Sequence, residues 1–213
     1  MPRLTLAALI ALAFVSLVLA ESKNPPEPPV PPSTPPPAAE SETPKFHLSK
    51  PIVKDIAELE HFVYGEVETT FETMMDAMTK TFFPLMESLG KDGVVYDYPA
   101  IFIYNGVKSD DPKAKFTLVT GYPARPECKA PKGYKIGKLE GHHCLSAYFT
   151  GPLSEISHAY QAIFKDLLAA GHQPTGQTRE LYLYWDGEES PNTVVEIQVT
   201  IAKPGKDHDA KKD

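Results

Sequence analysis

The sequence predicts one α+β domain, built from two copies of a β-α-β-β module that share an antiparallel sheet. Three observations predict it. A strand, a helix and two strands follow one another twice along the chain. Both helices carry apolar residues at helical spacing on one face, and several identities recur at one constant separation. Because neither module can bury its apolar face alone, we expect both helices on one side of the sheet and a cleft between the modules.

The first module covers about residues 55–124. Alternating apolar residues predict a strand at 58–68, and two more strands at 98–106 and 115–124. Between them, residues 69–90 predict a helix, whose last turn Pro84 should kink or shorten. The apolar positions of this helix are Phe71, Met74, Met75, Met78, Phe82, Leu85, Met86 and Leu89. We expect its four methionines to pack in the core.

The second module covers about residues 134–203 and repeats this order. Strands are predicted at 143–150, 178–186 and 193–202. The helix begins after Gly151-Pro152 and ends before Gly171, a glycine expected to adopt a left-handed conformation. Its apolar positions are Leu153, Ile156, Tyr160, Ile163, Phe164, Leu167 and Leu168.

A single offset along the chain aligns the two modules. It pairs Thr69 with Thr150, Phe83 with Phe164, Gly90 with Gly171 and Gly106 with Gly187. It also places Tyr104 on Trp185. The matched order of elements and the matched identities favour a duplicated module.

The ends of the chain differ in composition from the domain at 45–203. Residues 1–20 are apolar after Arg3 and end in small residues, which predicts a secretory signal peptide cleaved after Ala20; a retained membrane anchor is the alternative. Residues 21–44 hold ten of the 22 prolines and predict an extended linker. Residues 204–213 form a charged tail. We therefore expect a protein that is secreted or located in the periplasm or cell envelope.

Charge and cysteine content narrow the classes of partner and site. The formal net charge of −7 disfavours a nucleic-acid surface. Cys128 and Cys144 can form a disulfide in an oxidising compartment or stay as two thiols. His142, His143 and Cys144 are consecutive, but a structural zinc site needs a second pair of ligands, which is absent nearby in sequence. We expect no metal, no cofactor and no catalytic group.

The sequence resembles the GyrI-like superfamily of effector-binding domains over about residues 55 to 203. The resemblance rests on "YFTGPLSEISHAYQAIFKDLLAAGHQPTGQTRELYLYWD" and "VVEIQVTI". In these segments Gly151-Pro152, Tyr160, Gly171, Gly176, Glu180 with Tyr182, and Glu196-Ile197 occupy the places that characterise the family. In the first half Val119 stands where an acidic residue would be expected, and no helix-turn-helix segment precedes the domain.

The resemblance implies a cleft that binds a hydrophobic, often cationic, small molecule on aromatic side chains near a buried carboxylate. Glu196, flanked by apolar residues, is the expected carboxylate. The expected aromatic walls are Trp185, Tyr148, Tyr182, Tyr184 and Tyr104. Sequestration or sensing of such a ligand is the predicted function. Two alternatives stay open: a cell-envelope hydrolase that uses Glu196 on the same scaffold, and a protein-interaction module whose groove takes a peptide.

Overall fold

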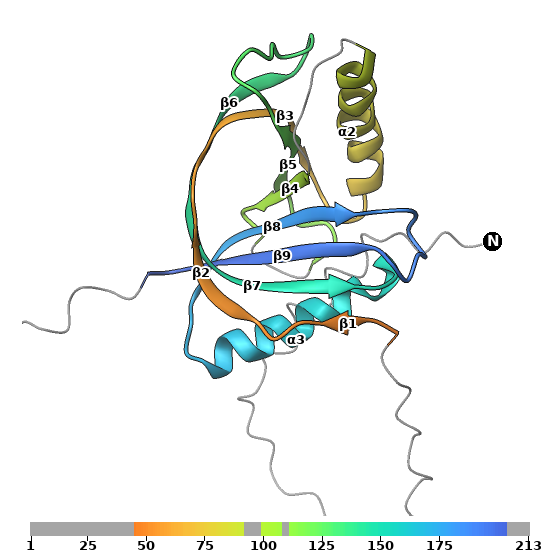
Figure 1. Cartoon of the computed structure of the whole chain (residues 1–213). Helices are drawn as coiled ribbons and strands as arrows, with labels where there is room; N and C mark the ends of the chain where they lie inside the picture. Colours follow the sequence, from red (N-terminus) through yellow and green to blue (C-terminus); the bar gives the residue numbers. More distant parts are fainter. Residues whose placement is uncertain (1–44, 92–98, 108–110, 204–213) are drawn as a thin grey trace, which may run out of the picture.

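The computed structural model describes residues 45–91, 99–107 and 111–203. The predicted signal peptide, proline-rich linker and charged tail lie outside these residues. The described chain forms a nine-stranded antiparallel sheet with two α-helices (Figure 1). In chain order its elements are β1 (His47–Leu48), β2 (Ile52–Ile56), β3 (Leu59–Thr69), α2 (Met74–Lys91), β4 (Ala100–Asn105), β5 (Phe116–Pro123), β6 (Lys135–Leu139), β7 (His142–Thr150), the 3-10 helix η2 (Leu153–Glu155), α3 (Ile156–Ala169), β8 (Pro174–Tyr184) and β9 (Val194–Ile201).

The order of strands is symmetric about the boundary between β4 and β8. Across the sheet the central strands run β7-β9-β8-β4-β5-β3. One half therefore consists of β3, α2, β4 and β5, and the other of β7, α3, β8 and β9. This arrangement matches the predicted α+β fold of two β-α-β-β units, joined at the antiparallel pairing of β4 with β8.

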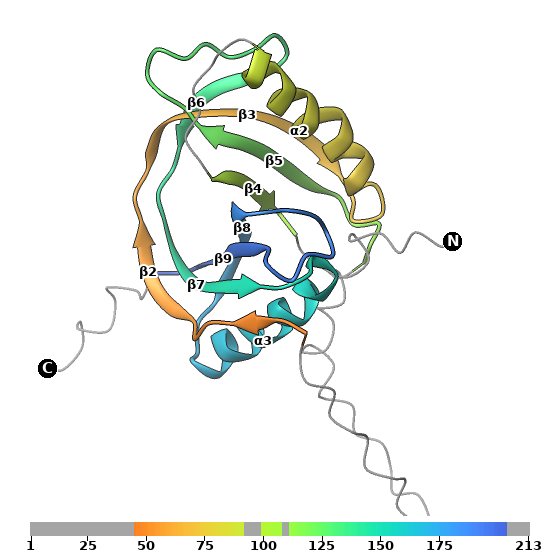
Figure 2. The same cartoon turned by 45° about the vertical axis from the view of Figure 1, so that its right-hand side comes forward.

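Both helices pack on the same face of the sheet, as expected. Figure 2 shows α2 against the upper half of the curved sheet and α3 against the lower half. Their buried side chains join those of the strands in one continuous apolar core. The face that carries the two helices is called the helix face below, and the opposite face of the sheet is called the far face.

The two helices correspond at a slightly shorter offset than the one expected from the sequence. The offset that fits is the one that pairs Phe82 of α2 with Tyr160 of α3, because both are buried. The expected offset would instead pair Phe83, which is 39% exposed, with Phe164, which is 8% exposed. Burial repeats every turn of a helix, so it fixes the match better than scattered identities do. The other buried pairs at the shorter offset are Met78 with Ile156, Leu85 with Ile163, and Leu89 with Leu167.

Strands β2 and β6 exchange between the halves, which the sequence did not predict. β2 precedes β3 in the chain but pairs with β7, from Ile52 opposite Ser146 to Ile56 opposite His142. β6 precedes β7 but pairs with β3. The chain thus crosses twice from one half to the other, as Figure 2 shows at the side away from the helices. A small apolar cluster on the far face contains Phe62, Ile101, Ile103 and Val119.

The observed ends of the two helices agree only in part with those predicted from the sequence. β3 continues to Thr69, and α2 begins only at Met74, after a turn in which the hydroxyls of Thr70 and Thr73 lie 3.0 Å apart. α2 continues past Pro84 to Lys91. α3 ends as predicted, because Gly171 has a φ of 76° and its N–H donates to the carbonyl of Leu168. Within the described part of the chain, neither helix combines the length and the apolar character that crossing a membrane requires.

Candidate functional site

A cleft of about 280 Å³ opens on the helix face, between α2 and the end of β8. Helix α2 forms one wall, β4 and β5 contribute the floor, and η2 with the β8–β9 loop closes the other side. Among the described lining residues, the polar side-chain groups are the carboxylate of Glu188, the phenols of Tyr122 and Tyr182, and the indole N–H of Trp185. The full lining is Met75, Met78, Phe82, Phe83, Met86, Ala100, Phe102, Tyr122, Leu153, Tyr182, Trp185 and Glu188.

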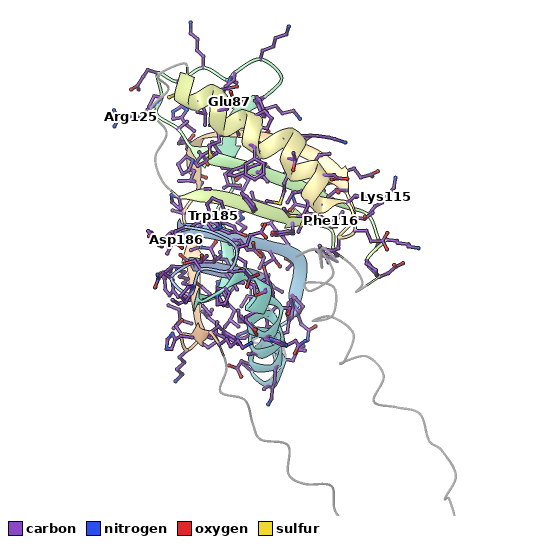
Figure 3. The ribbon with its side chains drawn as sticks, turned by 90° about the vertical axis from the view of Figure 1, so that its right-hand side faces the viewer. Glu87, Lys115, Phe116, Arg125, Trp185 and Asp186 are labelled. Atoms are coloured by element: carbon purple, nitrogen blue, oxygen red, sulfur yellow. The ribbon has the colours of Figure 1, made fainter. Side chains whose placement is uncertain are left out.

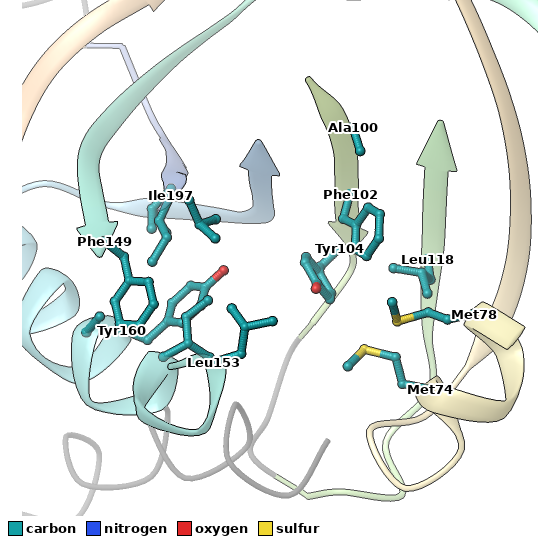
Figure 4. Close-up of a cluster of buried hydrophobic side chains, with 14 of the residues drawn as sticks. Met74, Met78, Ala100, Phe102, Tyr104, Leu118, Phe149, Leu153, Tyr160 and Ile197 are labelled. Carbon is teal, nitrogen blue, oxygen red and sulfur yellow. The ribbon is translucent and has the colours of Figure 1, made fainter. Parts of the chain in front are cut away.

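Aromatic rings stack through the floor of this cleft. Phe82 of α2 meets Phe102 edge to face, with ring centroids 4.7 Å apart, and stacks on Tyr122 at 5.6 Å. Phe102 in turn lies 4.8 Å from the ring of Tyr182. Contacts of this kind hold the floor in one geometry. Figure 4 shows Phe102 and Met78 on the α2 side of the core, with Leu153 and Tyr160 across from them.

The rim of the cleft exposes large apolar side chains. Phe83 is 39% exposed, Met86 is 40% exposed and Trp185 is 50% exposed. Trp185 follows the end of β8 and lies beneath α2 in Figure 3. Isolated exposed apolar residues are ordinary, but three around one cleft form a patch of the kind that marks a binding surface.

A buried carboxylate lies beside the cleft. Glu180 of β8 is 1% exposed, and its partner across the β4–β8 ladder is Phe102, a residue of the cleft floor. Three phenols donate hydrogen bonds to this carboxylate. Tyr160 donates to Oε1 at 2.7 Å, while Tyr104 and Tyr182 donate to Oε2 at 3.0 and 2.9 Å. Neutral donors thus satisfy the charged form of this buried group.

Burial is the largest influence on the pKa of Glu180. It raises the pKa of Glu180, and the three tyrosine hydrogen bonds offset only part of that rise. The pKa values of Tyr104, Tyr160 and Tyr182 are raised well above their usual range, first by burial and then by the adjacent carboxylate. The phenols therefore stay protonated and remain donors at neutral pH.

Glu196, the carboxylate expected from the sequence, lies on the far face. Its ladder partners are Tyr148 and Leu181, and Leu181 packs against the small far-face cluster. Lys54 of β2 forms an ion pair with Glu196 at 2.7 Å, and Ser146 and Gln198 donate to the same oxygen. Burial acts to raise the pKa of Glu196, but these hydrogen bonds outweigh it and leave the pKa lowered. Glu196 thus has a permanent cationic partner away from the cleft.

The expected aromatic residues do not all meet at the cleft. Tyr182 and Trp185 line the cleft, and Tyr104 is buried behind it on Glu180. Tyr148 lies on the far face, where the Lys54 ammonium is 5.9 Å from its ring centroid. Tyr184 is half exposed and is not among the lining residues.

Sequence reasoning assigned the methionines of α2 to core packing only. Met74 is fully buried, but Met75, Met78 and Met86 line the cleft. Their spacing does place them on one side of the helix, which agrees with a wall as well as with a core. The spacing of Glu180 and Tyr182 places both on one strand face, but that spacing does not say whether this face borders the cleft.

The cysteines and histidines near β7 lie in different surroundings. Cys144 lies on the far face and is buried, whereas Cys128 packs against the core of the helix face, so the structure does not join them by the disulfide that the sequence left open. His143 contacts Asp55 at 3.1 Å, and both ring nitrogens of His142 are buried without a hydrogen-bond partner of good geometry. In the described ranges no three His, Cys, Asp or Glu side chains cluster as metal ligands would.

Comparisons with known proteins agree with this fold. No curated protein matches the chain. The EcmrR C-terminal domain superposes with a TM-score of 0.58 and 16% identity, over 73% of this chain and 98% of that one. SAV2435 bound to tetraphenylphosphonium gives a TM-score of 0.54 and 8% identity, over 72% of this chain and 94% of that one. EcmrR in an EcmrR–DNA complex gives 0.57 and 15%, over 78% of this chain but only 60% of that one.

These identities are low, so the superpositions establish a shared fold. The family described as the GyrI-like small molecule binding domain matches residues 51–202. That range includes both helices and every strand from β2 to β9. The chain belongs to the GyrI-like small molecule binding domain family.

Proposed function

We propose that this protein binds a hydrophobic, aromatic cation in the cleft beside Glu180. The observation that carries the proposal is a buried carboxylate held by three phenols, one of which, Tyr182, also lines the adjoining apolar cleft. A carboxylate in an apolar environment is costly, and a bound cation would offset part of that cost. The described lining contains Glu188 and no lysine or arginine, so its charges also favour a cation.

The shape and chemistry of the lining support a delocalised rather than a compact charge. Aromatic faces attract cations, and Phe83, Tyr182 and Trp185 present such faces. Methionine side chains adapt to irregular guests, which suits the wall formed by Met75 and Met86. A small ammonium ion would leave this apolar surface unused. A ring-bearing cation would cover it and bury apolar area on both partners.

The relative bound to tetraphenylphosphonium supports the choice of probe. Its fold matches, and its ligand carries one positive charge within four phenyl rings. Binding of such ligands by this chain would serve sequestration or sensing. The apolar segment at residues 1–20 supports a site of action outside the cytoplasm, in the envelope or beyond. Fractionation of cells that produce the full chain tests this location: recovery only from the cytoplasm would contradict it.

Binding can be measured by titration of tetraphenylphosphonium with calorimetry or with Trp185 fluorescence. Glu180→Gln keeps the shape and removes the charge, and we expect it to weaken binding at least tenfold. Glu196→Gln is the matched control, because it makes the same change on the far face; its Kd should stay within about twofold. Neutral triphenylphosphine oxide should bind more weakly than the cation to the wild type. Equal Kd values for Glu180→Gln and the wild type would contradict the assigned site.

A further inference from the structure

We propose that residues 28–37 of this chain, PPVPPSTPPP, dock in the same cleft and compete with its ligand. The competition rests on the proposed function, whereas the docking stands on the cleft alone. The proline-rich segment would then act as an internal occupant of the site, which a ligand must displace.

The described chain begins close to the segment that leads into η2, one wall of the cleft. Phe46 packs on Phe149 with ring centroids 5.6 Å apart, and a Cβ placed on Gly151 would lie 2.8 Å from Phe46 Cβ. Shortly after Gly151, Leu153 lines the cleft, and its N–H donates to the carbonyl of Glu188, a second lining residue, at 2.7 Å. The proline-rich segment therefore joins the domain next to the wall formed by η2 and the β8–β9 loop.

The connecting sequence allows the segment to turn back towards the domain. Seven residues, 38–44, separate Pro37 from Lys45. An extended chain spans about 3.3 Å per residue, so this connection covers roughly 23 Å. The chain enters the domain against Gly151, which lies two residues before Leu153 of the cleft wall. The segment at 28–37 can therefore return to the cleft of its own domain.

The composition of the segment fits the lining. Seven of its ten residues are proline and none is charged. Proline-rich segments form polyproline II helices, whose binding costs little conformational entropy, and aromatic-lined grooves are their usual partners. The cleft offers the half-exposed indole of Trp185, the ring of Phe83 and the thioether of Met86 at its rim. Burial of these three side chains by prolines would cover the exposed apolar patch.

Charge selects the part of the linker that docks. The sequence on either side of residues 28–37 carries Glu27, Glu40 and Glu42. These carboxylates would be repelled by Glu188 and would be costly to bury among apolar rim residues. Only the uncharged run avoids both penalties, so the docked register is limited to it.

Trp185 is the sole tryptophan of the chain and reports directly on the site. The full chain is compared with a full-length variant in which Pro28, Pro29, Pro31, Pro32, Pro35, Pro36 and Pro37 are replaced by Ser. A control variant replaces Pro25, Pro26 and Pro44 instead. In the wild type and the control we expect blue-shifted Trp185 emission and weaker acrylamide quenching than in the seven-serine variant. The difference should not depend on protein concentration, because the docking is intramolecular.

Titration of the same three chains with tetraphenylphosphonium distinguishes the docking of the proline-rich segment from the proposed ligand binding. Tetraphenylphosphonium should bind the seven-serine variant at least threefold more tightly than the wild type, and a synthetic PPVPPSTPPP peptide should restore the blue shift of that variant. Identical emission and quenching in all three chains would overturn the docking, even with tetraphenylphosphonium bound. A clear emission difference with no tetraphenylphosphonium binding to any chain would leave the docking and remove the proposed ligand. A shift that grows with protein concentration would assign the cleft to a second copy and overturn the intramolecular form.

Discussion

Phe102 and Glu180 lie opposite each other across the junction of β4 and β8, and each occupies the same position in its own half of the domain. The offset between them along the chain is the one that also matches Phe82 of α2 with Tyr160 of α3. The approximate two-fold axis therefore passes between an apolar ring and a carboxylate.

The two helices differ in the same way as the two strands. In the first half Phe82 packs edge to face on Phe102, and in the second half Tyr160 donates to Glu180. Tyr104 and Tyr182, which correspond at the same offset, both donate to Oε2 of Glu180. One half thus supplies the apolar floor of the cleft, and the other supplies the charge beside it.

Removal of one phenol should destabilise the fold because it leaves the buried carboxylate short of a donor. Tyr160→Phe deletes the 2.7 Å bond to Oε1 and keeps the ring in the core. A hydrogen bond to a charged group contributes about 1.5–3 kcal/mol, so we expect a loss of that order in the free energy of unfolding measured with urea. Tyr184→Phe, at a half-exposed position, should change it by less than about 0.5 kcal/mol. Equal stability of the two variants would contradict a stabilising role for the hydrogen bond from Tyr160 to Glu180.

Lys54→Met should destabilise the fold because it removes the cationic partner of Glu196. The lysine side chain is 28% exposed and the glutamate side chain 8% exposed, so the variant leaves a largely buried carboxylate with two neutral donors. We expect a loss of about 1–3 kcal/mol in the free energy of unfolding. Lys54→Met combined with Glu196→Gln should recover part of that loss, as a double-mutant cycle would measure. Lys115→Met, which breaks the exposed pair with Glu68, is the matched control and should have little effect.

His142 should make the domain sensitive to mild acid. Burial, followed by the nearby Arg179, lowers its pKa to about 4 from an ordinary value of 6.5. Lys54 also lowers this pKa, while Gln198 and Glu196 oppose the shift. The unfolded chain therefore binds the proton more readily than the native one, and stability falls as pH drops from about 6.5 to about 4. His142→Gln removes this titration. Urea unfolding at pH 7 and at pH 4.5 should show a smaller acid loss in the variant than in the wild type, and equal losses would contradict the assignment.

Gly121 should be irreplaceable because β3 runs against it. A Cβ at this position would lie 2.1 Å from the carbonyl oxygen of Val63 and 2.8 Å from the Cβ of Tyr64. Both neighbours belong to the paired strand β3, so the backbone must shift, and Gly121→Ala should lose more than about 3 kcal/mol or fail to fold. In Gly137→Ala the nearest atom would be Tyr64 Cε1 at 3.9 Å, an ordinary contact. Thermal unfolding of that variant should match the wild type, which separates the clash from a general effect of glycine replacement.

Local periodicity explains why most elements could be predicted. The strands at 116–123 and 194–201 were predicted within one residue, because alternation of apolar side chains is a property of the strand itself. β2 and β6 were not predicted because both strands are short and pair only with strands of the other half. They also carry charged side chains, namely Lys54, Asp55, Lys135 and Lys138. Pairing between strands that are far apart in the chain leaves little pattern in the sequence of either strand.

Periodicity could not decide which of two carboxylates, Glu180 or Glu196, borders the cleft. Glu180 and Glu196 both interrupt apolar strands, and alternation assigns each to a face without saying which face carries the helices. Packing of α2 and α3 decided it, since Glu180 lies on the helix face beside Phe102 and Glu196 lies on the far face with Lys54. Sequence by itself determined most of the elements, the α+β fold class and the family, because these depend on periodicity and residue type. Tertiary structure alone decided which acid borders the cleft, because burial and partners are set by segments that meet only when the sheet closes.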